Sequence, residues 1–246
     1  MSSGVNSILS GPIILSVKVA ILSTIIVTVA GTLLALVMHR RRFPGQAGLE
    51  TLIGLPLVLP PTVIGFGLLL LFGRNGPLGS TLESVFHVRI VFTWWAAVIA
   101  AAVVSLPLLY RSAKAAFQAV DRNMEQAART LGASELRVFW TVTLPLARPG
   151  VLAGVLLAFA RALGEFGATL MLAGNIPGQT QTIPLAIFFA AESGDIETAG
   201  YLVAVITLIS FVVTYWLNDQ SRKQQMRTSA KRGVKNAGSG HHEMPA

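Results

Sequence analysis

The residues with the most scope for chemistry are two opposite charges inside an apolar segment. Arg161 and Glu165 lie in the run 151–173, and residues four apart share one face of a helix. Charges at such positions in a membrane are costly, so they usually face a cavity or one another. Arg161 could guide an anion along a pathway while Glu165 prevents tight trapping. Alternatively, the pair could neutralise itself and lock this helix to a neighbour.

Residues for other kinds of chemistry are missing from the sequence. The apolar runs contain no histidine and no carboxylate cluster, which argues against a membrane-embedded enzyme. The chain has no Gly-Lys-Ser or Gly-Lys-Thr phosphate loop, so we do not expect it to bind ATP itself. It has no cysteine, and His241 and His242 stand in a polar tail. We therefore expect no catalytic residue, no resident cofactor and no metal site.

The composition is too apolar for a soluble domain. Of the 246 residues, 53% are hydrophobic and 12% are charged, which is about half the charged share of a typical soluble domain. Several apolar runs reach the roughly 20 residues that span hydrocarbon, and in that medium a helix satisfies its own backbone. The sequence therefore predicts an all-α polytopic membrane protein with about five transmembrane helices. Their expected positions are near 13–38, 52–72, 91–110, 151–173 and 201–217.

The basic residues predict how these helices are oriented. Fifteen of the nineteen lie in the first loop, in segment 111–149 and in the tail, whereas the opposite side carries Arg74 and Arg89. Because basic residues favour the cytoplasmic side, we expect an outside N-terminus and a cytoplasmic C-terminus. The basic residues flank the spans and form no single patch, which disfavours nucleic acid as a partner. We expect residues 1–218 to form the transmembrane domain and 219–246 a disordered cytoplasmic tail.

The second apolar run is crowded with helix-breaking residues, because six prolines and glycines fall between positions 54 and 67. Proline removes an amide donor and kinks a helix, and such a break is tolerated in a membrane only where protein or water satisfies the freed carbonyls. The run could line a translocation path, with Pro60, Pro61 and Thr62 as candidate pathway residues. It could also be a kinked packing helix.

The segment between the third and fourth runs carries a spaced motif. Glu125 to Gly132 reads Glu-Gln-Ala-Ala-Arg-Thr-Leu-Gly, and nine residues separate Gly132 from Val142, which precedes Leu144-Pro145. This spacing resembles the coupling loop of permease subunits in binding-protein-dependent ABC importers. The family's glutamate position holds Gln126, and an acid stands one place earlier. The resemblance implies contact with a separate ATPase through Glu125, Gln126, Ala127, Ala128, Leu131, Gly132, Val142, Leu144 and Pro145.

The same loop has physical features of a docking segment. Residues 112–140 can form two short helices separated by a turn at Gly132, since glycine tolerates backbone angles that other residues avoid. Apolar anchors on this segment, which should be solvated, are Leu131, Leu136, Phe139 and Trp140. We expect Pro145 and Pro149 to end the loop and start the fourth span. An ATP-independent channel or secondary transporter would not need this loop.

Four further stretches are similar to the molybdate branch of these permeases. They are residues 55–65, 73–79, 161–169 and 174–182, and the likeness covers about residues 12–218. It implies a homodimer in the bacterial cytoplasmic (inner) membrane, in contact with lipid. The expected partners are two ATP-binding-cassette ATPase subunits and an external molybdate-binding protein. Sulfate/thiosulfate and tungstate permeases stay open, because these substrates are also tetrahedral dianions.

The segment before the last span has two interpretations. Residues 183–191 are too short to cross a bilayer, so we expect a helix or re-entrant segment at the outer face. The side chains just before it, Asn175, Thr180, Gln181 and Thr182, could touch the anion or the binding protein. An ordinary surface loop is the alternative.

Overall fold

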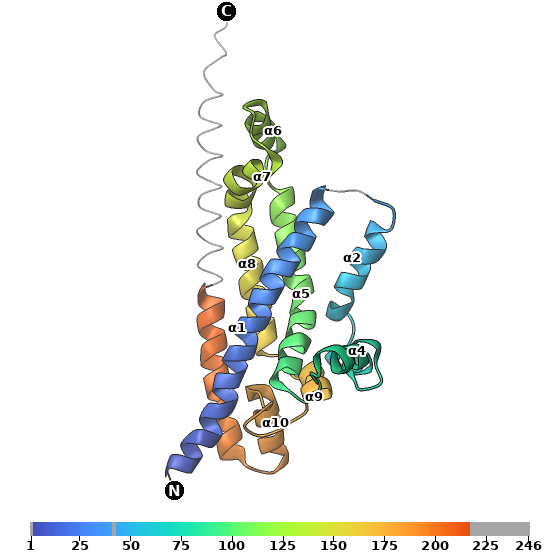
Figure 1. The fold of residues 1–246 in the computed structure, drawn as a ribbon. Coiled ribbons are helices and arrows are strands. Elements are labelled where there is room, and N and C mark those ends of the chain that lie inside the picture. Colours follow the sequence, from blue (N-terminus) through green and yellow to red (C-terminus); the bar gives the residue numbers. More distant parts are fainter. Residues whose placement is uncertain (1, 41–42, 217–246) are drawn as a thin grey trace, which may run out of the picture.

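The computed structural model describes residues 2–40 and 43–216, with side chains from residue 10 onward. Within these residues all regular structure is helical, as predicted. Three long helices form the body of an elongated bundle, in which α5 packs against both α1 and α8 (Figure 1). Their bounds are Ser2–Arg40 for α1, Trp94–Gln118 for α5 and Leu144–Leu163 for α8.

Small residues bring these helices close together. On α8, Gly150 and Gly154 face α5: a Cβ on Gly150 would lie 2.6 Å from Ala116 Cβ, and one on Gly154 would lie 2.8 Å from Ser112 Cβ. Glycines four apart are a common device for close helix contact in membranes, where apolar burial alone gives helices little reason to associate. The central helix α5 also buries small side chains, namely Ala96, Ala97, Ala100, Ala101 and Ala113.

The second predicted span is a broken helix. It divides into α2 (Gln46–Gly54), a single 3₁₀ turn (Leu55–Leu57) and α3 (Pro61–Phe72), and the two parts are bent by 114°. α3 begins at Pro61, where the missing amide costs nothing because a first-turn amide has no intrahelical partner. The predicted break at the prolines is thus present, and it changes the direction of the chain far more than a kink would.

The fourth predicted span, expected to be continuous over 151–173, is also divided. α8 ends at Leu163, and the short helix α9 (Gly167–Ala173) follows after a three-residue break. At its other end the helix runs further than predicted. α7 (Glu135–Val138), a π-helical turn (Phe139–Thr143) and α8 form one helix of 29 residues. Pro145 and Pro149 therefore lie within a continuing helix and do not mark where the span begins.

The remaining helices lie at the two ends of the bundle. α6 (Arg122–Thr130) and α7 stand at one end, and α9 and α10 (Ile183–Glu192) lie at the other, with the N-terminus (Figure 1). α4 (Pro77–Phe86) follows α3. The last described helix, Ile196–Trp216, reaches the limit of the described residues, so Leu217 and the predicted disordered tail lie outside them.

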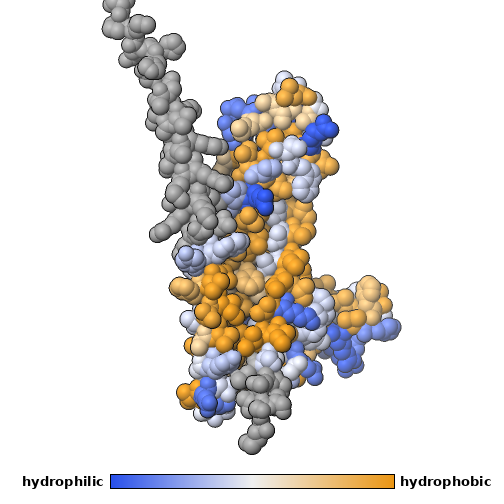
Figure 2. All heavy atoms as spheres, turned by 90° about the vertical axis from the view of Figure 1, so that its left-hand side faces the viewer, coloured by the Kyte–Doolittle hydropathy of each residue, from blue (hydrophilic) through white to orange (hydrophobic). Residues whose placement is uncertain are grey.

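The surface suits a lipid environment. Among residues 2–40 and 43–216, four helices are long and apolar enough to cross a membrane, or five if the bent pair α2–α3 counts as one span. Apolar residues cover much of the middle of the face that Figure 2 shows. Large apolar side chains are exposed along α1 and the last helix, among them Ile21, Ile25, Leu208 and Phe211.

Candidate functional site

The two broken spans pack against each other at their breaks. A Cβ on Gly65 of α3 would lie 2.7 Å from Ala168 Cα of α9, and one on Gly167 would lie 3.2 Å from Pro61 Cβ. The same added atom on Gly167 would lie 3.1 Å from Thr62 Cγ2. The structure thus joins two candidate stretches that are about a hundred residues apart in the chain. We refer to this contact between α3 and α9 as the broken-helix core.

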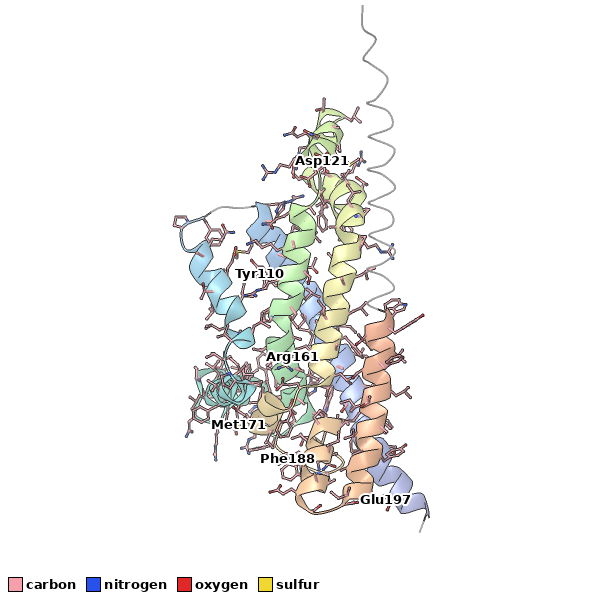
Figure 3. All side chains as sticks on the ribbon, turned by 180° about the vertical axis from the view of Figure 1, so that it is seen from behind. Tyr110, Asp121, Arg161, Met171, Phe188 and Glu197 are labelled. Atoms are coloured by element: carbon pink, nitrogen blue, oxygen red, sulfur yellow. The ribbon has the colours of Figure 1, made fainter. Side chains whose placement is uncertain are left out.

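Arg161 and Glu165 are paired at the edge of this core. Arg161 Nη1 lies 2.7 Å from Glu165 Oε2, and the side chains are 29% and 1% exposed. Glu165 Oε1 also accepts a hydrogen bond of 2.8 Å from the Ala168 amide. Figure 3 shows Arg161 near the end of α8 that leads into α9. The predicted pairing is therefore present, although the helix ends between the two residues.

The surroundings of the pair favour its structural role. Arg161 stands in the last turn of α8, where the helix dipole favours a cation, and Glu165 binds an amide at the start of α9, where it favours an anion. The pair thus connects the two halves of the broken span. Arg161 nevertheless keeps part of its surface accessible, so its contact with a passing anion stays a prediction.

The loop at the other end of the bundle has the predicted glycine turn, but only one of the two predicted short helices: α6 is short, whereas residues 112–118 belong to α5 and α7 continues into α8. α6 begins after Asp121, whose Oδ1 accepts a hydrogen bond of 2.9 Å from the Asn123 amide. It ends before Gly132, whose φ of +81° lies in the region that favours glycine. Figure 3 places Asp121 near the tip of this end. Leu131 is 88% exposed, which leaves a large apolar side chain available to a partner.

A set of polar contacts fastens this loop to the bundle. Arg129 Nε lies 2.5 Å from Glu135 Oε1, and Arg40 Nη1, at the end of α1, lies 3.2 Å from Glu135 Oε2. On the opposite side, Glu125 accepts a hydrogen bond from the Thr143 hydroxyl and has Arg129 Nη2 at 3.7 Å. The hydrogen bond that Arg129 donates to Glu135 raises the pKa of Arg129 above its ordinary value, so Arg129 stays charged. We call these five residues the loop clamp.

The clamp gives the acid at position 125 a role inside the protein. The Glu125 side chain is 13% exposed and turns toward the bundle, whereas Gln126 and Ala127 are exposed. The acid thus anchors the loop internally, and the neighbouring amide is free to face a partner. Sequence reasoning missed Arg40, Glu135 and Thr143. One signal of the clamp was present in the sequence, the four-residue spacing of Glu125 and Arg129, which places both on one helix face.

The second half of the motif joins the loop to α8. Val142 is half-buried in the π-helical turn, and Leu144 packs against a buried cluster that includes Ala35 and Phe117. Pro145 is exposed in the first turn of α8, and Ala128 is half-buried on α6. These positions therefore divide into anchors and exposed residues. Their predicted contact with an ATPase stays a prediction.

The predicted outer contacts are mostly internal. The buried Thr180 hydroxyl accepts a hydrogen bond of 3.0 Å from the Ile176 amide and donates one of 3.1 Å to the Gly174 carbonyl. Thr182 is also buried, whereas Asn175 and Gln181 are half-buried. Thr180 and Thr182 are therefore poor candidates for contact with an external protein in this conformation, because both are buried and the Thr180 hydroxyl bonds within the loop that precedes α10.

Metal chemistry finds no support in the part of the chain that the structure describes. Within residues 2–40 and 43–216, no group of three or more His, Asp or Glu side chains is placed to hold a metal ion. The candidate site thus consists of the broken-helix core at one end of α8 and the clamped loop at the other.

Comparison with known proteins decides the family. Residues 12–224 match the family described as binding-protein-dependent transport system inner membrane component. The chain belongs to this family. Two solved structures share the fold of the permease: an amino acid ABC transporter with histidines, with a TM-score of 0.62 and 20% identity, and the inward-facing MetNI methionine ABC transporter, with 0.66 and 14%. Each match covers 91% of this chain, and 96% and 99% of the respective structures.

Curated relatives of the permease are more similar in sequence. YvgM of Bacillus subtilis (strain 168), whose name assigns it to a molybdenum transport system, is 48% identical over 85% of this chain and 92% of its own length. The molybdenum transport system permease protein ModB of Escherichia coli (strain K12) is 43% identical over 87% and 96%. Sulfate permease 2 of Chlamydomonas reinhardtii is 38% identical over 83% of this chain and 55% of its own length.

Proposed function

We propose that this chain is the membrane permease subunit of an ATP-driven importer of molybdate. It acts as a homodimer with two ATPase subunits and an external molybdate-binding protein, in the bacterial cytoplasmic membrane. The assignment of molybdate as the substrate rests on one observation. The chain is 48% and 43% identical to two permeases named for molybdenum transport, over more than nine-tenths of their lengths. The sulfate permease is less similar and is matched over about half of its length.

The geometry supports a mechanical route from the ATPase to the translocation path. Closure of the ATPases on ATP would move the two loops, whose exposed Leu131 and Leu136 can enter a partner groove. The clamp links that movement to α1 through Arg40 and to the π-helical turn through Thr143. A helix that keeps its hydrogen bonds transmits displacement along its length, and π-helical turns are frequent at functional positions.

The far end of the same helix lies at the broken-helix core. The helix that starts at Glu135 in the loop ends at Leu163, two residues beyond Arg161. A displacement of the loop would therefore shift Arg161 and Glu165, and with them the contact between α9 and α3. The backbones of α3 and α9 approach closely at this contact, so a shift there would open or close the space between these two helices.

Uptake by a reconstituted complex tests the proposal. The permease, its ATPase and its binding protein are placed in vesicles, and uptake of labelled molybdate, tungstate and sulfate is measured with and without ATP. We expect ATP-dependent molybdate uptake that requires the binding protein. Uptake without ATP would instead support a channel or secondary transporter, and a preference for sulfate would move the permease to the sulfate branch.

A further inference from the structure

A second polar site lies in a groove between α2 and α5, away from the broken-helix core. The groove has a volume of about 460 Å³, and its walls include Thr51, Tyr110, Arg111 and Lys114. All four side chains can donate hydrogen bonds. Figure 3 shows Tyr110 on α5, between Arg161 and the loop end that bears Asp121. None of these residues belongs to the pathway or coupling positions described above.

The charges in the groove leave one cation uncompensated. Lys114 Nζ lies 2.5 Å from Glu50 Oε1, which also accepts a hydrogen bond of 3.0 Å from Gln46 Nε2. Arg111, in contrast, has no ion pair among the residues that the structure describes. The Tyr110 hydroxyl is buried at the wall of the groove. The site therefore has a net positive charge and several donors.

Arg111 stands where the groove meets the break in the second span. A Cβ added to Gly54 would lie 3.1 Å from Arg111 Nη2, so the guanidinium group lies over the last residue of α2. The chain then passes through the 3₁₀ turn to α3, which forms the broken-helix core with α9. Arg111 therefore lies on the loop side of the turn that leads to this core.

We propose that this groove is an exit site for the transported oxyanion, with Arg111 as its main ligand and Lys114 as a supporting donor. A planar guanidinium group can present two parallel N–H donors to two oxygens of a tetrahedral dianion. Glu50 weakens the site by neutralising Lys114, and a transit site must bind weakly enough to release its ion. The inference rests on the proposed function, because it assigns the ligand from the proposed substrate.

Protection of an introduced cysteine tests this site directly. The chain has no native cysteine, and Thr51 is exposed in the groove. The Thr51→Cys permease, in nanodiscs of uncharged lipid, is labelled with a thiol reagent with and without molybdate. With molybdate at about ten times its dissociation constant, mass action lowers the labelling rate about tenfold. In a Ser134→Cys permease, whose cysteine lies on the exposed loop, molybdate should not change the labelling rate. Labelling at this position also reports that the loop is intact.

Two further variants assign the effect to Arg111. Adding Arg111→Gln should abolish protection of position 51, whereas Arg148→Gln, which removes the same charge from an exposed position outside the groove, should preserve it. Protection that survives Arg111→Gln overturns the proposal. So does the absence of protection in a permease that imports molybdate, a result that leaves the proposed function intact. Failure of import would refute the proposed function separately.

The phosphate of a lipid headgroup is also a tetrahedral oxyanion and could bind the same donors, so a separate experiment must distinguish it from molybdate. Labelling is repeated without molybdate in nanodiscs that contain an anionic phospholipid. If the anionic lipid slows labelling of position 51 and molybdate in uncharged lipid does not, the groove is a lipid site and the exit-site proposal is wrong. Slowing by molybdate in uncharged lipid, lost with Arg111→Gln, supports it.

Discussion

Replacement of Gly65 by alanine should loosen the broken-helix core. The added Cβ would lie 2.7 Å from Ala168 Cα, 2.8 Å from Met171 Cβ and 2.9 Å from the Ala168 carbonyl oxygen. Carbon atoms in contact are normally about 3.5–4.0 Å apart, so α3 and α9 must separate by roughly 1 Å. Two of the three atoms belong to the backbone and cannot turn aside. Overpacking of this kind costs about 1–3 kcal/mol.

Gly67 provides a matched control on the same helix. A Cβ at this position meets nothing within 4 Å. In both variants alanine favours the helix over glycine by about 0.5–1 kcal/mol. The difference in stability between the two variants therefore measures the packing effect alone. Thermal unfolding of the purified permease, followed by circular dichroism, should show a lower melting temperature for Gly65→Ala than for Gly67→Ala. We also expect weaker molybdate uptake by the Gly65 variant.

An equal melting temperature and equal uptake for the two variants would refute the reasoning. That result would mean that α3 and α9 do not approach at Gly65, or that their approach does not matter for stability and transport.

Three other predictions concern the remaining parts of the permease. Gly132→Val should abolish ATP-driven uptake because a β-branched residue is strained at a φ of +81°, whereas Gly132→Asn, which tolerates that region, should retain most of it. Glu165→Leu should reduce the amount of assembled permease, since leaving Arg161 without its partner costs about 3–5 kcal/mol. The double variant with Arg161→Leu should recover assembly, and uptake then separates a structural pair from a pathway role. Finally, an impermeant thiol reagent outside the membrane should label Ser193→Cys and spare Ser134→Cys, and the reverse would invert the predicted orientation.

Local sequence features predicted much of the architecture. The length of the apolar runs indicated membrane helices because a run of about 20 apolar residues can hide its backbone only in a helix. The prolines before Thr62 indicated a break because proline lacks an amide. The glycine at position 132 indicated a turn between two short helices, and the structure has a positive φ there. Each of these conclusions depends on residues that are neighbours in the chain.

Other local patterns did not decide the structure. In the apolar run 151–173, Gly164 was too weak a signal to place the end of the helix at Leu163, because the break also depends on Glu165 binding the start of α9. The motif did not show that Glu125 turns inward, since its partner Thr143 is 18 residues away. Thr180 and Thr182 carried polar groups suited to an exposed contact, and the fold buries them.

Local patterns were enough to predict a helical membrane protein with the loop motif of its family, because apolar length, turn residues and motif spacing act over a few helical turns. The long-range contacts could be seen only in the folded chain: α3 meets α9, Glu135 joins Arg40 to Arg129, and Arg111 lies over Gly54. In a bilayer, the apolar surface of a helix has no strong preference for protein over lipid. Helix partners are therefore chosen by close fits of small residues and by a few polar contacts, and both depend on segments far apart in the chain.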